Sequence, residues 1–173
     1  MSYNFSLLSF NVNGLGDSFK RRCIFNWIRN HFFNFILFLQ ETHTTPICEK
    51  KWEFEWGSKI FFSHGESNCR GVAILIPPQL DYHIIDTDRD TNGRYLKVTL
   101  EINDTKFVMT NIYAPTKDHP TDQYAFFEFL ADKLFLHCHE NLIIGGDFNI
   151  TLNPSIDKKE GEQRLNLDIG KTY

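Results

Sequence analysis

The sequence has few cysteines and no pairing pattern among them. Its four cysteines, Cys23, Cys48, Cys69 and Cys138, form no Cys-x-x-Cys pair and follow no regular spacing. This argues against a disulfide framework and against a structural zinc site of the Cys-x-x-Cys type. A reducing compartment is therefore expected.

Long apolar runs and a secretion signal are also missing. No stretch approaches the roughly 18 apolar residues that a membrane-spanning helix needs, and no basic segment followed by an apolar run begins the chain. The sequence thus predicts an intracellular protein of the nucleus or cytoplasm, neither secreted nor membrane-spanning.

An excess of positive charge is lacking as well. The chain has 18 Lys and Arg against 22 Asp and Glu, a formal net charge of -4. General attraction to polyanions is therefore not a property of the whole chain, which weakens the case for a pure nucleic-acid-binding module. A divalent-metal site remains compatible with this balance, because magnesium prefers carboxylate and amide oxygens.

Apolar and aromatic residues, by contrast, are plentiful. Hydrophobic residues make up 42% of the 173 residues and aromatic residues 15%, with 17 phenylalanines spread along the chain. This composition is typical of a protein with one sizeable core. We expect a single domain over 1–173, in which 158–173 is a poorly defined polar tail.

Short apolar runs separated by turn residues predict a series of β-strands. The runs at 5–12 and 35–39 are those expected of buried strands, and Asn103-Asp104 is typical of a hairpin turn. In chain order, strands are expected at 5–12, 35–39, 59–63, 71–76, 82–88, 95–102, 106–112 and 141–144.

Two segments have apolar residues at helical spacing. The first is 19–32, which Ser18 can cap and in which Lys20, Arg21 and Arg22 are interpreted as a solvated face. Its apolar face is expected to hold Ile24, Trp27 and Ile28.

A second helix is expected from Thr121 or Asp122 to about 137, with its apolar face formed by Phe127, Leu130, Ala131 and Leu134. The stretch around Trp52 and Trp56 fits neither pattern clearly. Helices packed outside sheets indicate a mixed α/β fold.

Polar side chains recur where the apolar strands end. These are Asn11, Glu41, Tyr113, Asp147 and Asn149. Asp147 and Asn149 flank Phe148, so in extended geometry they point to one side and Phe148 points into the core. A carboxylate can orient a water or accept its proton, and an amide can hold a phosphoryl oxygen.

Each of these residues also has an ordinary structural interpretation. Asp147 and Asn149 suit an Asx turn after a strand, and Glu41 suits a solvated carboxylate at a strand exit. Asn13, followed by Gly14, is a common turn signal, and Tyr113 before a proline-containing loop is often a packing residue. The residues taken singly leave both interpretations open.

The order of four sequence blocks adds weight to the functional interpretation. The blocks at 9–15, 39–43, 111–115 and 145–149 resemble, in sequence order, four motifs of the endonuclease/exonuclease/phosphatase superfamily. Within it, the chain is most similar to the apurinic-type endonuclease domain of non-LTR retrotransposons. Three features carry that likeness: Gln40-Glu41-Thr42-His43, the run 70–76, and 152–158 with its Asp157-Lys158 pair.

The resemblance implies a fold, a cofactor and residue roles. The implied fold is a two-sheet β-sandwich flanked by helices, with four layers in the order α/β/β/α. Glu41, assisted by Asn11, would bind Mg²⁺, with Mn²⁺ as a possible substitute. Asp147 would orient or deprotonate the attacking water, and Asn13, Tyr113 and Asn149 would contact the phosphate.

Two departures from the family pattern stand out. Thr116 follows Pro115 where this branch commonly has Asn, and the closing Ser-Asp-His block is absent from the sequence. We therefore expect a chain that is truncated at its C-terminus, with an incomplete fold and weak or no activity alone.

The sequence is compatible with three functions. The first is a DNA-nicking endonuclease domain of a retroelement, whose partners are DNA and a downstream reverse transcriptase in the same polyprotein. The second is a phosphatase of the same superfamily that acts on lipid or nucleotide phosphoesters. The third is a non-catalytic relic or binding module.

Overall fold

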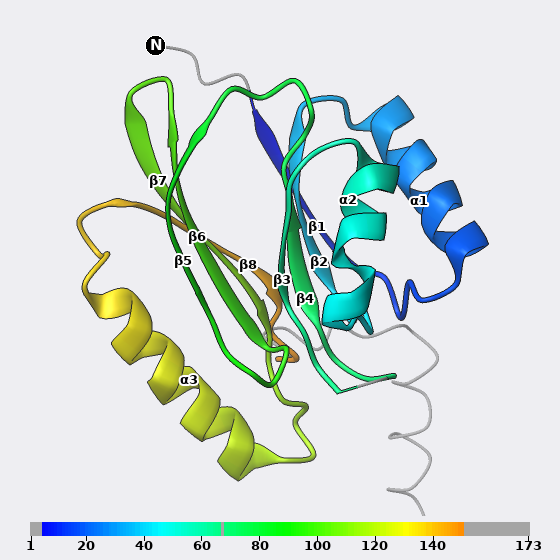
Figure 1. Cartoon of the computed structure of the whole chain (residues 1–173). Helices are drawn as coiled ribbons and strands as arrows, with labels where there is room; N and C mark the ends of the chain where they lie inside the picture. The colour runs from blue at the N-terminus through cyan, green and yellow to red at the C-terminus, as the bar shows by residue number, and fades with distance from the viewer. Residues whose placement is uncertain (1–4, 67, 151–173) are drawn as a thin grey trace, which may run out of the picture.

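The computed structural model describes residues 5–66 and 68–150. Within these residues the chain forms two four-stranded sheets and three α-helices (Figure 1). The predicted features at 152–158 and 158–173 lie outside the described residues. The strands are β1 (Ser6–Asn11), β2 (Phe35–Gln40), β3 (Ile60–Ser63), β4 (Val72–Leu75), β5 (His83–Arg89), β6 (Tyr95–Ile102), β7 (Thr105–Tyr113) and β8 (Asn141–Asp147).

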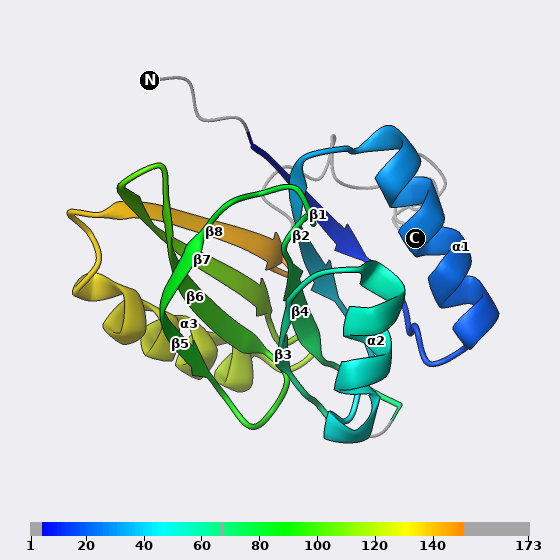
Figure 2. The same ribbon diagram turned by 45° about the horizontal axis from the view of Figure 1, so that its top comes forward.

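The helices lie on the outer faces of the two sheets. Figures 1 and 2 show α1 (Ser18–His31) and α2 (Glu49–Trp56) on one side and α3 (Pro120–Phe135) on the other. A short 3-10 helix (Pro46–Cys48) precedes α2. One apolar core lies between the sheets, and one lies beneath the helices on each outer side. The four-layer α/β/β/α sandwich expected from the resemblance is therefore confirmed.

Each sheet contains one parallel strand pair, and each of these pairs includes an edge strand. The strand orders are β1-β2-β4-β3 and β5-β6-β7-β8. β1 runs parallel to β2 after the crossover through α1, and β7 runs parallel to β8 after the crossover through α3. Because parallel strands end at the same sheet edge, each unit brings two strand ends together. β1 and β8 also lie against each other, so the two edges meet.

A pair of buried amides links the sheets near these strand ends. The Nε2 of Gln40 donates to Oδ1 of Asn111 at 2.7 Å, across the interface between β2 and β7. The Nδ2 of Asn111 donates to the carbonyls of Leu39 at 2.9 Å and Ala73 at 2.8 Å. Satisfied buried amides of this kind fix one relative placement of the layers, because a shifted packing would leave polar atoms unpaired.

Helix α1 differs from its prediction in its cap and in its buried face. Asp17 caps it by accepting from the Lys20 backbone at 2.7 Å, whereas Ser18 was predicted to do so. Ile28 is buried as expected, but Trp27 is 46% exposed. Arg21, predicted to be solvated, is 2% exposed and donates to Glu55 of α2 at 3.0 Å. A buried arginine is tolerated here because the partner carboxylate neutralises it.

Helix α2 and the start of α3 were also misjudged from the sequence. Trp52 and Trp56 are buried on α2, a stretch for which neither a helix nor a strand was predicted. α3 begins at Pro120, after a cap residue, His119, that makes no side-chain capping bond. The proline has no N–H to satisfy at the first helical position, so it starts the helix where Thr121 or Asp122 was expected to cap it.

Strand β1 was predicted to be buried, and it is mostly exposed. Phe10 is 40% exposed and Leu7 is 37% exposed. An apolar run cannot reveal strand order, and in the described residues this strand lies at the edge of its sheet.

Candidate active site

The strand registers bring four of the predicted site residues to one end of the sandwich. Asn11 pairs with Gln40, the residue before Glu41, at the ends of β1 and β2. Tyr113 pairs with Asp147 at the ends of β7 and β8. The two parallel units therefore deliver one carboxylate each to the place where their edges meet.

The amide of Asn11 joins the two carboxylates. Its Nδ2 donates to Oε1 of Glu41 at 2.9 Å and to Oδ2 of Asp147 at 3.0 Å. Its Oδ1 accepts from the backbone N–H of Asn13 at 3.1 Å. Glu41 and Asp147, more than 100 positions apart in the sequence, thus face a common space on opposite sides of one amide.

The backbone that carries Glu41 has a conformation that non-glycine residues rarely adopt. Glu41 has φ 54° and His43 has φ 53°, both in the left-handed region. The loop is held by hydrogen bonds from the Gly14 N–H to the Glu41 carbonyl at 2.7 Å and from the Thr42 N–H to the Gly71 carbonyl at 3.0 Å. Such outliers persist where surrounding contacts over-determine them, which is common at functional sites.

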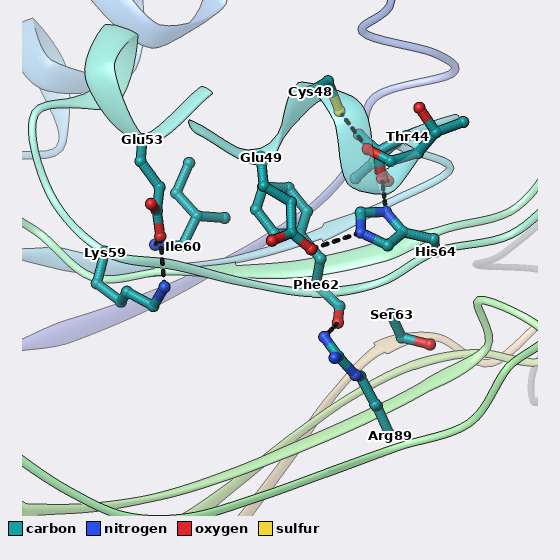
Figure 3. A network of polar contacts seen from close by, with 12 residues as sticks. Thr44, Cys48, Glu49, Glu53, Lys59, Ile60, Phe62, Ser63, His64 and Arg89 are labelled. Carbon is teal, nitrogen blue, oxygen red and sulfur yellow. Dashed lines mark hydrogen bonds and ion pairs between the residues drawn. The ribbon is translucent and has the colours of Figure 1, made fainter. Parts of the chain in front are cut away.

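Side chains linked by hydrogen bonds support the same loop, and Figure 3 shows Glu49, His64 and Thr44 among them. His64 lies between Glu49, whose Oε1 is 2.7 Å from Nε2, and Thr44, whose Oγ1 is 3.0 Å from Nδ1. Thr44 in turn is 3.0 Å from the hydroxyl of Thr42, beside Glu41. Because Thr42 and Thr44 are buried, these hydrogen bonds fix the backbone on which the Glu41 side chain stands.

Tyr113 lies beside Glu41 with its hydroxyl held in the neutral form. Burial, and then the hydrogen-bonding and charge of the neighbouring Glu41, raise the pKa of this phenol to about 12. Arg94 lies 5.3 Å from the ring centroid and donates to the Tyr113 carbonyl at 2.9 Å. A neutral phenol can donate a hydrogen bond to an anionic oxygen.

Asp147 ends β8 in a tight approach to β7. A side chain on Gly146, at φ 136°, would place its Cβ 2.1 Å from the Ile112 carbonyl, so only glycine fits there. The Asn149 N–H donates to Oδ1 of Asp147 at 3.0 Å. With the bond from Asn11, both oxygens of this carboxylate are oriented by the protein.

The sequence allowed Asn149 to be a turn residue or a site residue, and the structure places it in a turn directly after Asp147. Its φ of 51° shows that the extended geometry does not continue past Asp147. Its Nδ2 donates to the Ala114 carbonyl at 2.7 Å, and within residues 5–66 and 68–150 its second amide N–H has no partner. The prediction that Phe148 points into the core was wrong, since it is 39% exposed.

Asn13 stands apart from the other predicted residues. It is exposed in the loop after β1, and its carbonyl accepts from the Nζ of Lys20 at 2.8 Å. The same ammonium group binds the carbonyls of Val12 and Gly14. Lys20 therefore closes this loop, which corrects its interpretation as part of a solvated face.

The donor set fits a hard divalent cation with few protein ligands. Glu41 and Asp147 present carboxylate oxygens to one space, where the Asn11 amide nitrogen donates to both, whereas no group of three or more His, Cys, Asp and Glu gathers as a metal-binding cluster in the described residues. Magnesium is commonly bound by one or two carboxylates, with water completing its shell.

Two residues near the site were not singled out from the sequence. Nε2 of His43 is 3.8 Å from Oε2 of Glu41, and Arg94 packs on Tyr113. His43 belongs to the second sequence block, so its position beside Glu41 was a usable signal. Nothing in the local sequence around Arg94 marks it.

Comparison with known proteins identifies a family and related chains. The family model described as Endonuclease/Exonuclease/phosphatase family matches residues 8–166. The "Transposon TX1 uncharacterized 149 kDa protein" of Xenopus laevis is 32% identical over 149 residues, which are 86% of this chain and 11% of that protein. The chain thus spans about a ninth of that relative.

Solved structures share the fold. An AP endonuclease from Archaeoglobus fulgidus matches with a TM-score of 0.66 and 22% identity, over 92% of this chain and 62% of that one. D. rerio TDP2 complexed with a single-strand DNA product matches with a TM-score of 0.65 and 15% identity, over 88% and 63% of the two chains. The chain belongs to the endonuclease/exonuclease/phosphatase family of enzymes.

Proposed function

We propose that this chain is a magnesium-dependent phosphodiesterase that nicks DNA, with Mn²⁺ as a possible substitute metal. The observation that carries the proposal is the Asn11 amide, which holds Glu41 at 2.9 Å and Asp147 at 3.0 Å around one space. A base and a cation-binding carboxylate that share one amide donor suit the attack of water on a phosphodiester.

The two carboxylates have separate roles in the proposed reaction. Glu41 would hold the metal, assisted by Asn11, whose Nδ2 orients the Glu41 carboxylate at 2.9 Å; the metal would stabilise negative charge on the phosphoryl oxygens. Asp147 accepts a proton from the attacking water while Asn11 and Asn149 keep its carboxylate oriented.

The remaining groups contact the phosphate. The neutral hydroxyl of Tyr113 and the free amide N–H of Asn149 donate to phosphoryl oxygens, and Asn13 contacts the strand at the rim. The water oxygen forms a new P–O bond, the opposite P–O bond breaks, and the leaving oxygen takes a proton from solvent.

DNA as substrate and a retroelement context rest on the relatives. The transposon relative supports a domain of a longer polyprotein, and the single-strand DNA product in the TDP2 structure supports a DNA substrate. We propose that a reverse transcriptase lies downstream in the same polyprotein. We further propose that 1–173 is one domain with a polar tail. No Ser-Asp-His run occurs in the sequence, so activity of the chain alone should be weak.

Plasmid nicking tests the proposal. We expect slow conversion of supercoiled to open-circular DNA that requires Mg²⁺ and falls at least about a hundredfold in Glu41→Ala and Asp147→Asn. Glu128→Ala and Asp132→Asn, exposed carboxylates of α3, are matched controls that should retain the rate. Nicking that survives in the two site variants refutes the assignment.

A parallel assay on small lipid and nucleotide phosphoesters separates the phosphatase alternative. Glu41-dependent phosphate release from these substrates without nicking would make the chain a phosphatase. A wild type without any metal-dependent activity would favour the non-catalytic alternative. Robust nicking would refute only the prediction that the chain alone has weak activity.

A further inference from the structure

A cavity of about 440 Å³ lies next to the catalytic cluster and has no part in the proposed reaction. Its lining combines two guanidinium groups with an apolar wall. The residues that matter are Arg70, Asn92, Arg94, Pro115, Phe126 and Phe129. A volume of this size is in the range of pockets that take small organic ligands.

The cavity and the active site share their walls. Arg94 lines the cavity and also packs against Tyr113, with its guanidinium 5.3 Å from the ring centroid. Pro115 belongs to the loop that follows Tyr113. The carbonyl of Arg70 accepts from the N–H of His43 at 2.9 Å, so the other wall is tied to the Glu41 loop. A strand with one phosphate at Tyr113 would have its next unit within reach of this cavity.

The charges of the cavity favour an anionic group. Burial, and then the nearby charge of Arg70, lower the pKa of the Arg94 guanidinium, which places the two cations close together. Within the described part of the chain, the Arg70 guanidinium forms no hydrogen bond or ion pair. An anion in the cavity would relieve the repulsion between these two groups.

The two carboxylates of the lining, Asp90 and Asp122, offset part of the positive charge at Arg94, so the anionic group is assigned to Arg70. Asp90 is turned toward the protein, because its Oδ1 accepts from Ser63 Oγ at 2.7 Å and from the N–H of Arg94 and of Tyr95 at 3.1 Å each. Asp122, in the exposed first turn of α3, is available to accept from a neutral N–H donor.

The remaining wall is suited to a flat apolar group. Phe126, only 9% exposed, and Phe129, whose ring meets Tyr95 edge-on at 5.3 Å, are fixed by the core under α3. Asn92 and Asp122 offer hydrogen-bonding groups at the rim. The Arg70 guanidinium, the apolar wall and the hydrogen-bonding groups of Asn92 and Asp122 match the phosphate, the face and the edge of a nucleotide, in that order.

We propose that this cavity binds one unpaired nucleotide of the strand whose neighbouring phosphate lies at Tyr113, with its phosphate toward Arg70 and its base against Pro115 and Phe126. The inference rests on the proposed function, because it assumes a nucleic-acid strand in the active site. It makes Arg70 and Asn92 substrate-binding residues and sets a preference for unstacked DNA.

Fluorescence anisotropy on one labelled oligonucleotide, as a single strand and as a fully paired duplex, tests the proposal with divalent metal chelated so that no strand is cut. Arg70→Gln keeps the bulk of the side chain and should weaken single-strand binding about tenfold. The same change should weaken duplex binding less than about twofold, since a paired base cannot enter the cavity. Asn92→Ala should shift the preference among bases in the single strand.

The matched control is Arg22→Ala, which removes an equal charge from the exposed face of α1 and should change neither affinity. Equal losses on both oligonucleotides would reveal a general backbone contact and overturn the inference, as would an Arg70→Gln protein that behaves like the control. Wild-type protein that binds neither oligonucleotide overturns it too.

The plasmid assay keeps this result separate from the proposed function. A wild type that nicks DNA while Arg70→Gln binds like the control refutes the nucleotide site alone. If the wild type never nicks DNA and the Arg70→Gln variant binds the single strand more weakly than the wild type does, the catalytic proposal is refuted and the nucleotide site is supported.

Discussion

The inner and outer strands contribute to the candidate site in different ways. β2 and β7 are buried along most of their length and lead to Glu41 and Tyr113. Among the described residues, β1 and β8 are edge strands without a fully buried residue, and they end in Asn11 and Asp147. The inner half, β2 and β7, should therefore contribute most to the free energy of unfolding, and the outer half, β1 and β8, most to the reaction rate. The Asn11 amide links the two halves.

The largest effect is expected from the inner half. Asn111→Ala removes the donor to the Leu39 and Ala73 carbonyls and the acceptor of Gln40, all of them buried. Leaving these groups unpaired should lower the free energy of unfolding by about 3 kcal/mol. Urea denaturation measures it, with the exposed Asn141→Ala as the control. Equal losses in the two variants would contradict the assigned role of the buried amides.

The outer half should show the opposite balance. Asn11→Ala frees both carboxylates, so nicking should fall about a hundredfold, the scale of losing one preorganised donor at a reacting centre. Because β1 is exposed, the free energy of unfolding should change by less than about 1 kcal/mol. Asn30→Ala on α1 is the control for both measurements. A large stability loss with unchanged nicking would reverse the comparison.

His64, which follows β3, sharpens the comparison, since it supports the backbone of Glu41 without lying in the site. His64→Ala breaks the chain from Glu49 through Thr44 to Thr42 and should lower kcat about tenfold with KM unchanged. His64→Gln, which can keep one hydrogen bond, should recover part of the rate. The exposed His83→Ala is the control, and a change confined to KM would argue against a positioning role.

The smallest effect concerns alkaline stability. The pKa of Tyr113 rises from 10.0 to about 12 on folding, so the folded state favours the neutral phenol. The resulting stabilisation is complete below about pH 10 and is lost as the pH rises toward about 12. Between about pH 10 and about pH 12, the free energy of unfolding of Tyr113→Phe should therefore fall less than that of the wild type. Urea denaturation at several pH values measures this difference. The exposed Tyr124→Phe should follow the wild type, and identical curves for all three would refute the prediction.

Much of the fold and site could be predicted because short-range patterns carry them. Apolar runs gave the strands, and the polar residues that end them gave Asn11, Glu41, Tyr113 and Asp147, which the registers bring together. Parallel strands that end at one edge make such a gathering a direct consequence of topology.

The rest depends on contacts that local sequence does not encode. The burial of Arg21 requires Glu55 on another helix, and the role of Lys20 requires the carbonyls of a loop that folds back onto α1. The exposure of β1 follows from strand order, and the left-handed turn at Asn149 from the Ala114 carbonyl that fixes its side chain. The features predicted at 152–158 remain predictions.

Paramagnetic broadening by Mn²⁺ in an NMR spectrum of the isotope-labelled chain tests the central claim most directly. If the two strand ends share one cation-binding space, substoichiometric Mn²⁺ should erase the amide signals of Asn11, Glu41 and Asp147 together and spare those of β5, and Glu41→Ala should abolish the effect. Broadening centred on the carboxylates of β5, or an Asp147 signal that survives while Glu41 vanishes, would contradict the shared site.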